Sequence, residues 1–409
     1  MSSYGNMGKL VAQSQGDWDQ ARRAGLLSIR TTPGTDGRLV TADGHEFFNL
    51  VSCSYLGLNR HPAVVEGAID ALRREGLLST SVSRCRIAPR LLDEVEALMS
   101  ELFRADAFLT PSCAAASAGV LPLLASGHLT DGHRPLMVFD RNCHFSMNIM
   151  KAACANDTEV VTCAHNDVAA LDQLCQKHRR VAYIADGAYS MGGNAPFREL
   201  QALQDRYGLF LYLDDSHSVS ICGERGVGLA RSAFAELPEQ TIIVASLAKA
   251  FGASGGLVLL GGRQQRRLLD VSGGPLGWSQ MLNTPSLGAV RASARLHFTP
   301  ELPRLQAELQ ATMQRIDAHL HTENAGNGLP IRVIDLPEPR AAIDAAARLY
   351  QLGYYCSAVF FPIVAKGRAG IRVMGRVDLA PEDVLRFCQH AQSIFEECRA
   401  ACAQDGVEA

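Results

Sequence analysis

Short, uniformly apolar runs recur along the middle of the chain, and each ends in polar residues or glycine. The runs are LMVFD ending at Asp140, VAYIAD at Asp186, LFLYLDD at Asp215, TIIVAS at Ser246 and GLVLLGG at Gly262. Stretches with helical periodicity separate them. Continuous apolar runs are typical of strands buried on both faces, and their alternation with helices predicts a mostly parallel sheet in an α/β domain. Ligands of such domains collect at the carboxyl ends of the strands.

The pattern differs at the two ends of the chain. Residues 1–45 are polar and rich in turn formers, which predicts an arm, and residues 289–325 are typical of one long amphipathic helical region. The runs IRVIDL, YYCSAVFF and GIRVMG predict the strands of a small α+β domain, closed by a helix from Glu382 to Arg399. We therefore expect an arm over 1–50, a large domain over 51–290 and a small domain over 291–409.

Composition narrows the function classes. Of 409 residues, 47% are hydrophobic and 20% charged, which is ordinary for a globular chain. The formal charge of −3 gives no basic footprint for nucleic acid or an anionic membrane, and no apolar run approaches the roughly 18 residues of a membrane span. The start, MSSYGNMGKL, has no apolar export signal, and the 12 cysteines form no C-x-x-C pair. We expect reduced thiols, no metal site and a cytoplasmic protein.

Two segments carry candidate chemistry. In LYLDDSHSVSICGERGVGLA, the carboxylate of Asp214 at a strand end is followed three residues later by His217 and then by a glycine-rich loop. In ASLAKAFGASGG, Lys249 lies among small residues with no charged neighbour nearby. An arbitrary lysine is usually a solvated surface residue, but one partly shielded at a strand end is a carbonyl-reactive amine. Ser246, three residues earlier, offers a hydroxyl to a phosphate.

These segments and several others resemble the fold-type I pyridoxal-phosphate (PLP) enzymes. The motifs are SCSYLGL (52–58), DRNCHFS (140–146), HND (165–167), DGAYSMGGNAP (186–196), DDSHS (214–218), SLAKAFG (246–252) and FPIVAKGRAGIRV (361–373). More narrowly, the chain resembles the α-oxoamine synthases, which include 8-amino-7-oxononanoate synthase, 2-amino-3-ketobutyrate ligase, 5-aminolevulinate synthase and serine palmitoyltransferase. The residues of its motifs are most similar to those of the amino-ketone autoinducer synthases. The resemblance implies a large domain with a mostly parallel seven-stranded sheet and a smaller α+β carboxyl-terminal domain.

The resemblance also implies roles for individual residues. Lys249 would hold PLP and move protons, Asp214 would pair with the pyridine nitrogen, and His144 would stack on the ring. His217 and Ser190 would bind the phenolic oxygen, and Arg372 the substrate carboxylate. Backbone amides at a helix start would cradle the phosphate. The full set of implied cofactor-binding residues is Ser112, Cys113, Ala114, His144, Asp186, Ser190, Asp214, His217, Ser246, Lys249, Ser279 and Gln280. Singly, His144, Asp186 and Arg372 also fit structural roles, as a buried histidine, a turn cap and an ion pair.

The activity that the resemblance implies is condensation of an amino acid with an acyl thioester to an α-amino ketone, in a decarboxylative or a non-decarboxylative form. The thioester is either acyl-coenzyme A or an acyl carrier protein. Positions that tend to face the substrates depart from the family: Cys53-Ser54, Cys85, Ala88, Pro89, Asp93, Ser220 and Asn283-Thr284. Both substrates therefore stay open.

A PLP-dependent aminotransferase or lyase of the same fold is the main alternative. An inactive partner subunit is disfavoured because Lys249 is present. The resemblance further implies a homodimer, with segment 277–285 reaching the partner's site.

Overall fold

The chain forms two units in a computed structural model that describes residues 7–405. One unit is continuous over residues 56–306, and the other joins the N-terminal segment through Tyr55 to the segment from Ala307 onward. The sequence had suggested an independent arm over 1–50 and a boundary after 290. The structure differs because the N-terminal segment shares a sheet and a core with the C-terminal segment, and because the second boundary falls inside a helix.

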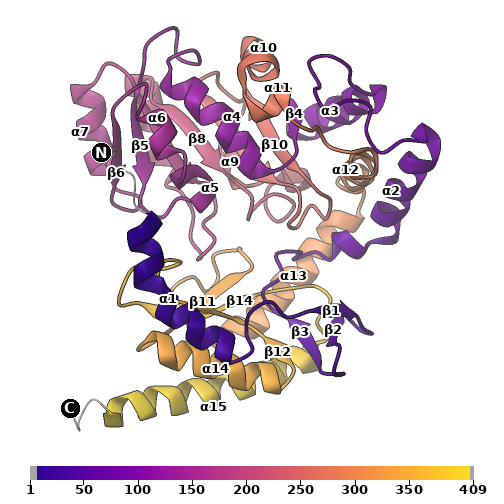
Figure 1. Cartoon of the computed structure of the whole chain (residues 1–409), viewed down its shortest axis with the longest axis vertical. Helices are drawn as coiled ribbons and strands as arrows, with labels where there is room; N and C mark the ends of the chain where they lie inside the picture. Colours follow the sequence, from indigo (N-terminus) through magenta and orange to yellow (C-terminus); the bar gives the residue numbers. More distant parts are fainter. Residues whose placement is uncertain (1–6, 406–409) are drawn as a thin grey trace. The chain divides into compact units, whose positions relative to one another are not determined.

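The continuous unit is built on a seven-stranded sheet (Figure 1). Its strands are β4 (Asp106–Thr110), β5 (Leu136–Asp140), β6 (Val160–Cys163), β7 (Val181–Asp186), β8 (Phe210–Asp214), β9 (Thr241–Ser246) and β10 (Gly256–Leu260). They lie in the order β4-β10-β9-β8-β7-β5-β6, and β10 alone runs antiparallel to its neighbours in this sheet. The predicted mostly parallel seven-stranded sheet is confirmed.

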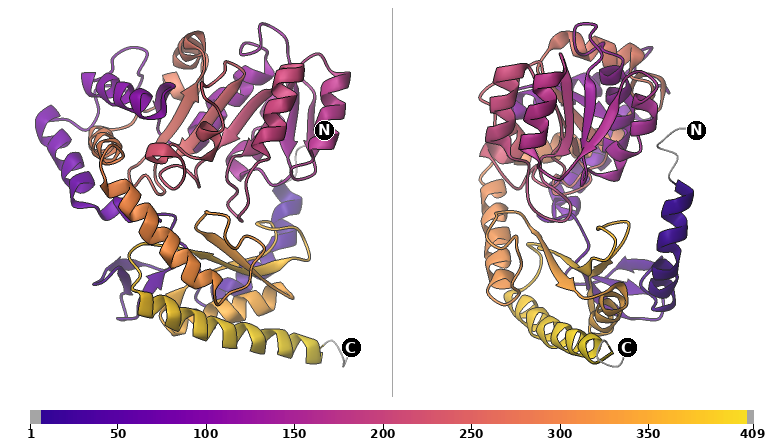
Figure 2. Two further views of the ribbon diagram at one scale, coloured as in Figure 1. Left: turned by 180° about the vertical axis from the view of Figure 1, so that it is seen from behind. Right: turned by 90° about the vertical axis from the view of Figure 1, so that its left-hand side faces the viewer.

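Helices cover both faces of this sheet (Figures 1 and 2). The helices of the unit are η1 (Leu58–Arg60), α2 (Pro62–Glu75), α3 (Arg90–Phe103), α4 (Cys113–Ala125), α5 (Phe145–Asn148), α6 (Lys151–Cys154), α7 (Val168–Lys177), α8 (Phe197–Tyr207), η2 (Glu224–Gly226), α9 (Leu229–Ser232), α10 (Arg263–Ser272), α11 (Pro275–Trp278) and α12 (Thr284–Leu296). Helix α4 consists of small and apolar residues and packs on β4, β9 and β10. Its small side chains let it lie close to the strands.

The region from 289 to 325 is two helices rather than the single helical region that its periodicity suggested. Helix α12 ends at Leu296, and α13 (Glu301–Asp317) begins directly after Pro300. Proline lacks the amide hydrogen that a helix interior needs, so it starts a new helix instead of continuing the old one. The boundary between the two units lies within α13.

The second unit combines elements from both ends of the chain. Its elements are α1 (Met7–Arg23), β1 (Thr31–Pro33), β2 (Arg38–Thr41), β3 (Glu46–Asn49), β11 (Ile331–Leu336), α14 (Pro339–Gln351), β12 (Tyr354–Tyr355), β13 (Ser357–Val359), β14 (Ala369–Met374) and α15 (Pro381–Asp405). Strands β1, β2, β3 and β12 form one sheet, and β11, β14 and β13 form another. The run YYCSAVFF, expected as one strand, supplies β12 to the first sheet and β13 to the second.

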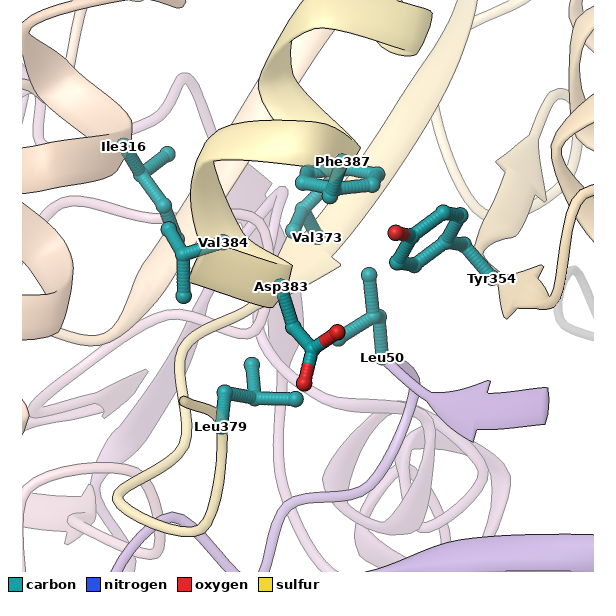
Figure 3. Close-up of a pocket in the computed structure, with 8 residues that line it drawn as sticks. All are labelled: Leu50, Ile316, Tyr354, Val373, Leu379, Asp383, Val384 and Phe387. Atoms are coloured by element: carbon teal, nitrogen blue, oxygen red, sulfur yellow. The ribbon is translucent and has the colours of Figure 1, made fainter. Parts of the chain in front are cut away.

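An apolar core explains why the N-terminal segment belongs to this unit. Figure 3 shows Leu50, which follows β3, beside Tyr354 of β12, Val373 of β14 and Phe387 of α15. Leu50, Val373 and Phe387 are all buried, and β3 pairs with β12 through Phe48 and Tyr354. The predicted polar arm therefore contains a helix and three strands. Its few apolar residues are buried against partners that lie far along the chain.

Candidate active site

Three aspartates end three neighbouring strands of the seven-stranded sheet. Asp140 ends β5, Asp186 ends β7 and Asp214 ends β8. The three strands are parallel, so their last residues share one edge, and Asp186 lies directly opposite Asp214 in the ladder. All three side chains are buried. This edge is where ligands of parallel sheets bind.

The carboxylate of Asp214 is held by several donors. Its Oδ1 accepts hydrogen bonds from the backbone nitrogen of Ser216 at 3.0 Å and from the Ser216 hydroxyl at 2.5 Å. Its Oδ2 lies 3.4 Å from the donating thiol of Cys113. Hydrogen bonds to a carboxylate stabilise its charged form. The site therefore presents an oriented carboxylate.

Lys249 lies in the tight turn that follows β9. Its Nζ is 2.9 Å from Nε2 of His217, which follows β8. Leu247, Ala250 and Phe251 around it are buried, whereas the Lys249 side chain is half-exposed. The predicted lysine and histidine are thus brought together with Asp214, which precedes His217 by three residues.

Gly252 closes the Lys249 turn against another family-like motif. Its φ is +74°, and a Cβ added here would lie 2.4 Å from the backbone carbon of Leu58. Such a contact is far inside van der Waals distance, and positive φ is unfavourable for other residues. The motif SLAKAFG therefore ends in glycine because the SYLGL segment packs directly against it.

The N-terminus of α4 faces the same strand edge. Ser112 caps the helix, and its hydroxyl accepts a hydrogen bond from the Ala115 nitrogen at 3.1 Å. The amides of Cys113 and Ala114 begin a helix of 13 residues. A Cβ on Gly256 would lie 2.5 Å from the Cys113 nitrogen, so glycine there lets β10 approach the helix start. Free amides and the helix dipole at such an end favour a phosphate.

His144 lies after β5 and caps the short helix α5. Its Nδ1 accepts from the Ser146 nitrogen at 3.3 Å and lies 2.8 Å from the Ser146 hydroxyl, while the side chain remains exposed. The His144 backbone nitrogen donates to Asp186 at 2.8 Å. Burial raises the pKa of Asp186 well above its usual range, and neighbouring Asp214 raises it further. A cationic ligand beside these two carboxylates would offset their repulsion.

Asp140 organises the loops beside the site, a role that the sequence did not reveal. It accepts from the backbone of Asn142 at 2.7 Å and of Asn166 at 2.8 Å, and from the Tyr183 hydroxyl at 2.8 Å. Burial acts to raise the pKa of Asp140, but these bonds and one from His165 lower it overall. Asp140 thus ties the HND motif to β5, which makes this part of the motif a scaffold.

Asp215 and Ser216 are further residues that motif reading did not single out. Asp215 Oδ2 accepts from the Ala230 nitrogen at 2.9 Å, and burial raises the pKa of Asp215 to about 7. A Cβ on Gly228 would lie 2.3 Å from this oxygen, so the glycine-rich loop can pack on Asp215 only with glycine. The adjacent pair Asp214-Asp215 could have indicated this role in the sequence. Neighbouring residues at a strand end point in opposite directions, so only one of the two carboxylates can face the site.

The remaining predicted residues lie on other parts of the fold, apart from Ser246, whose backbone nitrogen donates to the Ser216 hydroxyl at 2.7 Å. Ser190 lies in the turn between β7 and α8, and Ser246 ends β9 beside the lysine turn. Ser279 and Gln280 are exposed after α11. Arg372 lies on β14 in the other unit, opposite Val333 and Ser357. Their binding roles stay predictions.

Several positions expected to face substrates have structural partners. The Ser220 hydroxyl lies 2.9 Å from Nε2 of buried His297, and the Asn283 side chain caps α12. The Cys85 thiol donates to the carbonyls of Asp270 at 2.8 Å and Gly277 at 3.1 Å. These contacts hold loops together and account for those residues without a substrate.

Comparison with known proteins agrees with this geometry. The family model for aminotransferase class I and II matches residues 45–390. The 8-amino-7-oxononanoate synthase of Geobacter sulfurreducens is 29% identical over 96% of this chain and 97% of its own length. A putative 8-amino-7-oxononanoate synthase of Pasteurella multocida is 30% identical over 88% of this chain and 93% of its own. The structure of serine palmitoyltransferase from S. paucimobilis with a bound PLP-myriocin aldimine matches with a TM-score of 0.82 at 18% identity, over 95% and 99% of the two chains.

The fold and the lysine, aspartate and histidine at one strand edge define a PLP-dependent transferase of fold type I. The chain belongs to the aminotransferase class I and II family and, within it, to the α-oxoamine synthases, as its motifs predicted. PLP is accordingly the cofactor, and the enzyme is an acyltransferase rather than an aminotransferase or lyase. Within residues 7–405, no helix is long and apolar enough to span a membrane. No group of three or more metal-ligating side chains is placed to hold a metal among these residues.

Proposed function

We propose that the enzyme condenses an amino acid with an acyl thioester, releasing the amino-acid carboxylate as carbon dioxide and forming an α-amino ketone. The observation that carries this proposal is the arrangement at one strand edge of an amine, Lys249, and an oriented carboxylate, Asp214, beside a helix N-terminus. The family relationship supplies the reaction class, and these residues supply its physical basis.

The side chains and amides present fit PLP. The start of α4 suits the phosphate, the Lys249 amine suits the aldehyde, and the exposed His144 ring suits one face of the pyridine. Burial raises the pKa of Asp186 well above its usual range, the neighbouring carboxylate of Asp214 raises it further, and Lys249 acts in the opposite direction. A protonated pyridine nitrogen beside Asp214 would offset the repulsion between the two carboxylates.

When bound, the cofactor supplies an electron sink for the bond broken at the α-carbon of the amino acid. The chain's own residues do the rest. Lys249 carries and returns the proton, and its partner His217, 2.9 Å away, keeps the amine oriented toward the site. Three donors hold the Asp214 carboxylate in place. Arg372, a guanidinium suited to bidentate carboxylate binding, is proposed to hold the amino acid.

Turnover with a substrate panel tests the proposal. The purified enzyme, loaded with PLP, is incubated with each of several amino acids and with acyl-coenzyme A or acyl carrier protein thioesters. We expect free thiol and carbon dioxide to appear together, and only when both substrates are present. Release of a keto acid without thioester would instead make the enzyme an aminotransferase.

We also propose a homodimer. Apolar side chains are exposed along α2 and the segment after it, including Val65, Ile69, Leu78 at 62% and Val82 at 70%. This segment is tied to the 277–285 loop, because the Leu78 carbonyl accepts from Thr284 and the Gly277 carbonyl accepts from Ser83. Exposed apolar side chains gathered on one segment suit an interface, and two-fold pairing is the commonest assembly. Ser279 and Gln280 would then bind phosphate in the partner's site.

The proposed compartment is the cytoplasm. All twelve cysteines are free thiols, and most are buried. Burial raises the pKa of Cys154 to about 12 and of Cys163 to about 11, so these thiols are protonated and inert at neutral pH. Thiols used as small apolar residues suit a reducing compartment.

A further inference from the structure

We propose that Ser216 is a positioning residue for Asp214, and that Cys113 assists it, so that together they keep the pyridine nitrogen of the cofactor protonated. This inference rests on the proposed function, because it concerns how Asp214 acts on the cofactor. It gives a role to Ser216, the residue of the DDSHS motif that lies between the two aspartates and the histidine.

The Ser216 hydroxyl joins the two segments that carry the reactive groups. It donates to Asp214 Oδ1 at 2.5 Å and accepts from the backbone nitrogen of Ser246 at 2.7 Å. Ser246 is the last residue of β9 and precedes Lys249 by three positions. One buried hydroxyl thus fixes the aspartate relative to the start of the lysine turn.

The hydroxyl is needed here because the ladder between β8 and β9 has ended. The last ladder pair is Asp214 with Val244, and the Asp215 carbonyl turns away to accept from Ser218 and Val219. No carbonyl of β8 is left for the Ser246 nitrogen, and a buried amide without an acceptor is costly. The Ser216 side chain takes the place of that carbonyl.

Cys113 approaches the same carboxylate from the first turn of α4. Its thiol lies 3.4 Å from Asp214 Oδ2 and 3.9 Å from the Ser216 hydroxyl. Burial raises the pKa of Cys113 well above its usual range, and Asp214 adds to the effect, so the group remains a neutral donor. Both donors therefore act on Asp214 without adding charge.

For the cofactor, the donors to Asp214 affect whether the pyridine nitrogen carries a proton. Donors to Asp214 stabilise its charged form, and a charged Asp214 favours the protonated pyridine nitrogen opposite it. If the Ser216 hydroxyl were lost, the negative charge on Asp214 would be less well stabilised, and the carboxylate would pair less strongly with a protonated ring nitrogen. The ring then withdraws electrons less well.

The test compares Ser216→Ala with Ser218→Ala. Ser218 is a matched control, since it is also buried and its hydroxyl accepts from the Leu229 nitrogen at 2.7 Å instead of contacting Asp214. Each protein is loaded with PLP labelled with nitrogen-15 in the ring, and the nitrogen resonance is recorded without substrate. We expect S216A to move toward the unprotonated value and S218A to match the wild type. Exchange of the amino-acid α-proton should fall roughly 10- to 100-fold in S216A, the range for a hydrogen bond to a charged group.

A second pair of variants decides the matter if S216A does not fold. Cys113→Ala removes the weaker donor and should move the resonance in the same direction by a smaller amount, whereas Cys113→Ser restores it. An unshifted resonance in S216A, or identical spectra for C113A and C113S when S216A is unfolded, would overturn the inference while leaving the proposed function intact. A wild-type protein that takes up no PLP would overturn both.

Discussion

The amine of Lys249 and Nε2 of His217 lie 2.9 Å apart, although they follow different strands and are 32 residues apart in sequence. The lysine turn follows β9 and the histidine follows its neighbour β8, so the parallel sheet alone makes them adjacent. In the sequence, the lysine among small residues and the histidine after an aspartate are two separate features. The register of β8 and β9 brings them into one site.

Replacement of Lys249 with alanine should remove turnover and leave the fold intact. We expect a loss of roughly four orders of magnitude or more, because no other amine reaches the same position in the turn. The thermal midpoint should change little, since the side chain is half-exposed. Lys151→Ala is the control: its amine contacts Thr162 at 2.9 Å, and turnover should persist. Near-normal rates in K249A would remove Lys249 from catalysis.

Gly252→Ala should damage both stability and activity. The added Cβ would lie 2.4 Å from the Leu58 backbone at a φ of +74°, so the lysine turn and the SYLGL segment have to separate. We expect a loss of about 3–5 kcal/mol in the free energy of unfolding.

Gly76→Ala separates the clash from the backbone strain. Gly76 has a φ of +67° but nothing within 4 Å of an added Cβ. Its replacement should therefore cost only about 1 kcal/mol, measured by urea unfolding. Equal losses in the two variants would show that strain alone explains the effect.

His297 should make the enzyme less stable in acid. Burial lowers the pKa of His297 from 6.5 to about 4, so the unfolded chain binds the proton more readily. The stabilisation is complete above about pH 6.5 and is lost as the pH falls toward 4, by about 3 kcal/mol in all. His297→Gln should flatten this part of the profile in urea unfolding at pH 7.5 and 5.

The control for that profile is His319→Gln. His319 Nδ1 contacts the carbonyl four residues earlier at 2.8 Å, as His297 does, but the side chain is only partly buried. The wild-type slope should persist in this variant. The assignment fails if H297Q retains the wild-type slope as well.

Leu78→Asp with Val82→Asp should convert the proposed dimer to a monomer. Both side chains are largely exposed in the single chain, and a charge in an apolar interface is costly. Leu352→Asp, at a leucine of the other unit that is 48% exposed, should leave the assembly unchanged. Sedimentation velocity distinguishes the species, and a fully active wild-type monomer would contradict the proposal.

The strands were predictable where burial is complete. VAYIAD and TIIVAS coincide with β7 and β9, because both faces of these strands are covered and apolar residues fill most positions. The four-residue β6 was missed because two of its residues are not buried. The strands before residue 50 were missed for a different reason, since their partner β12 lies far away in the sequence and local pattern carries no trace of it.

The site was predictable at the residues that carry charge or reactivity. Lys249, Asp214 and His217 have chemistry that a motif records, and the structure brings them together. Ser216 and Asp140 act through hydrogen bonds to residues up to 43 positions away, so their role depends on strand register. A serine in a loop carries no sign of such a bond until the strands are placed.

The pairing of β3 with β12 has a consequence for how the protein is made. The Tyr355 hydroxyl donates to the Leu26 carbonyl across 329 positions, and β3 has no other partner on that side. At about 5–20 residues per second, the ribosome would deliver this partner roughly 15–65 s after the N-terminal segment emerges. Residues 56–306 contain every strand of the large sheet and can assemble during that interval. Until then Phe47, Phe48 and Leu50 lack the partners that bury them, so this segment completes its folding after residues 56–306.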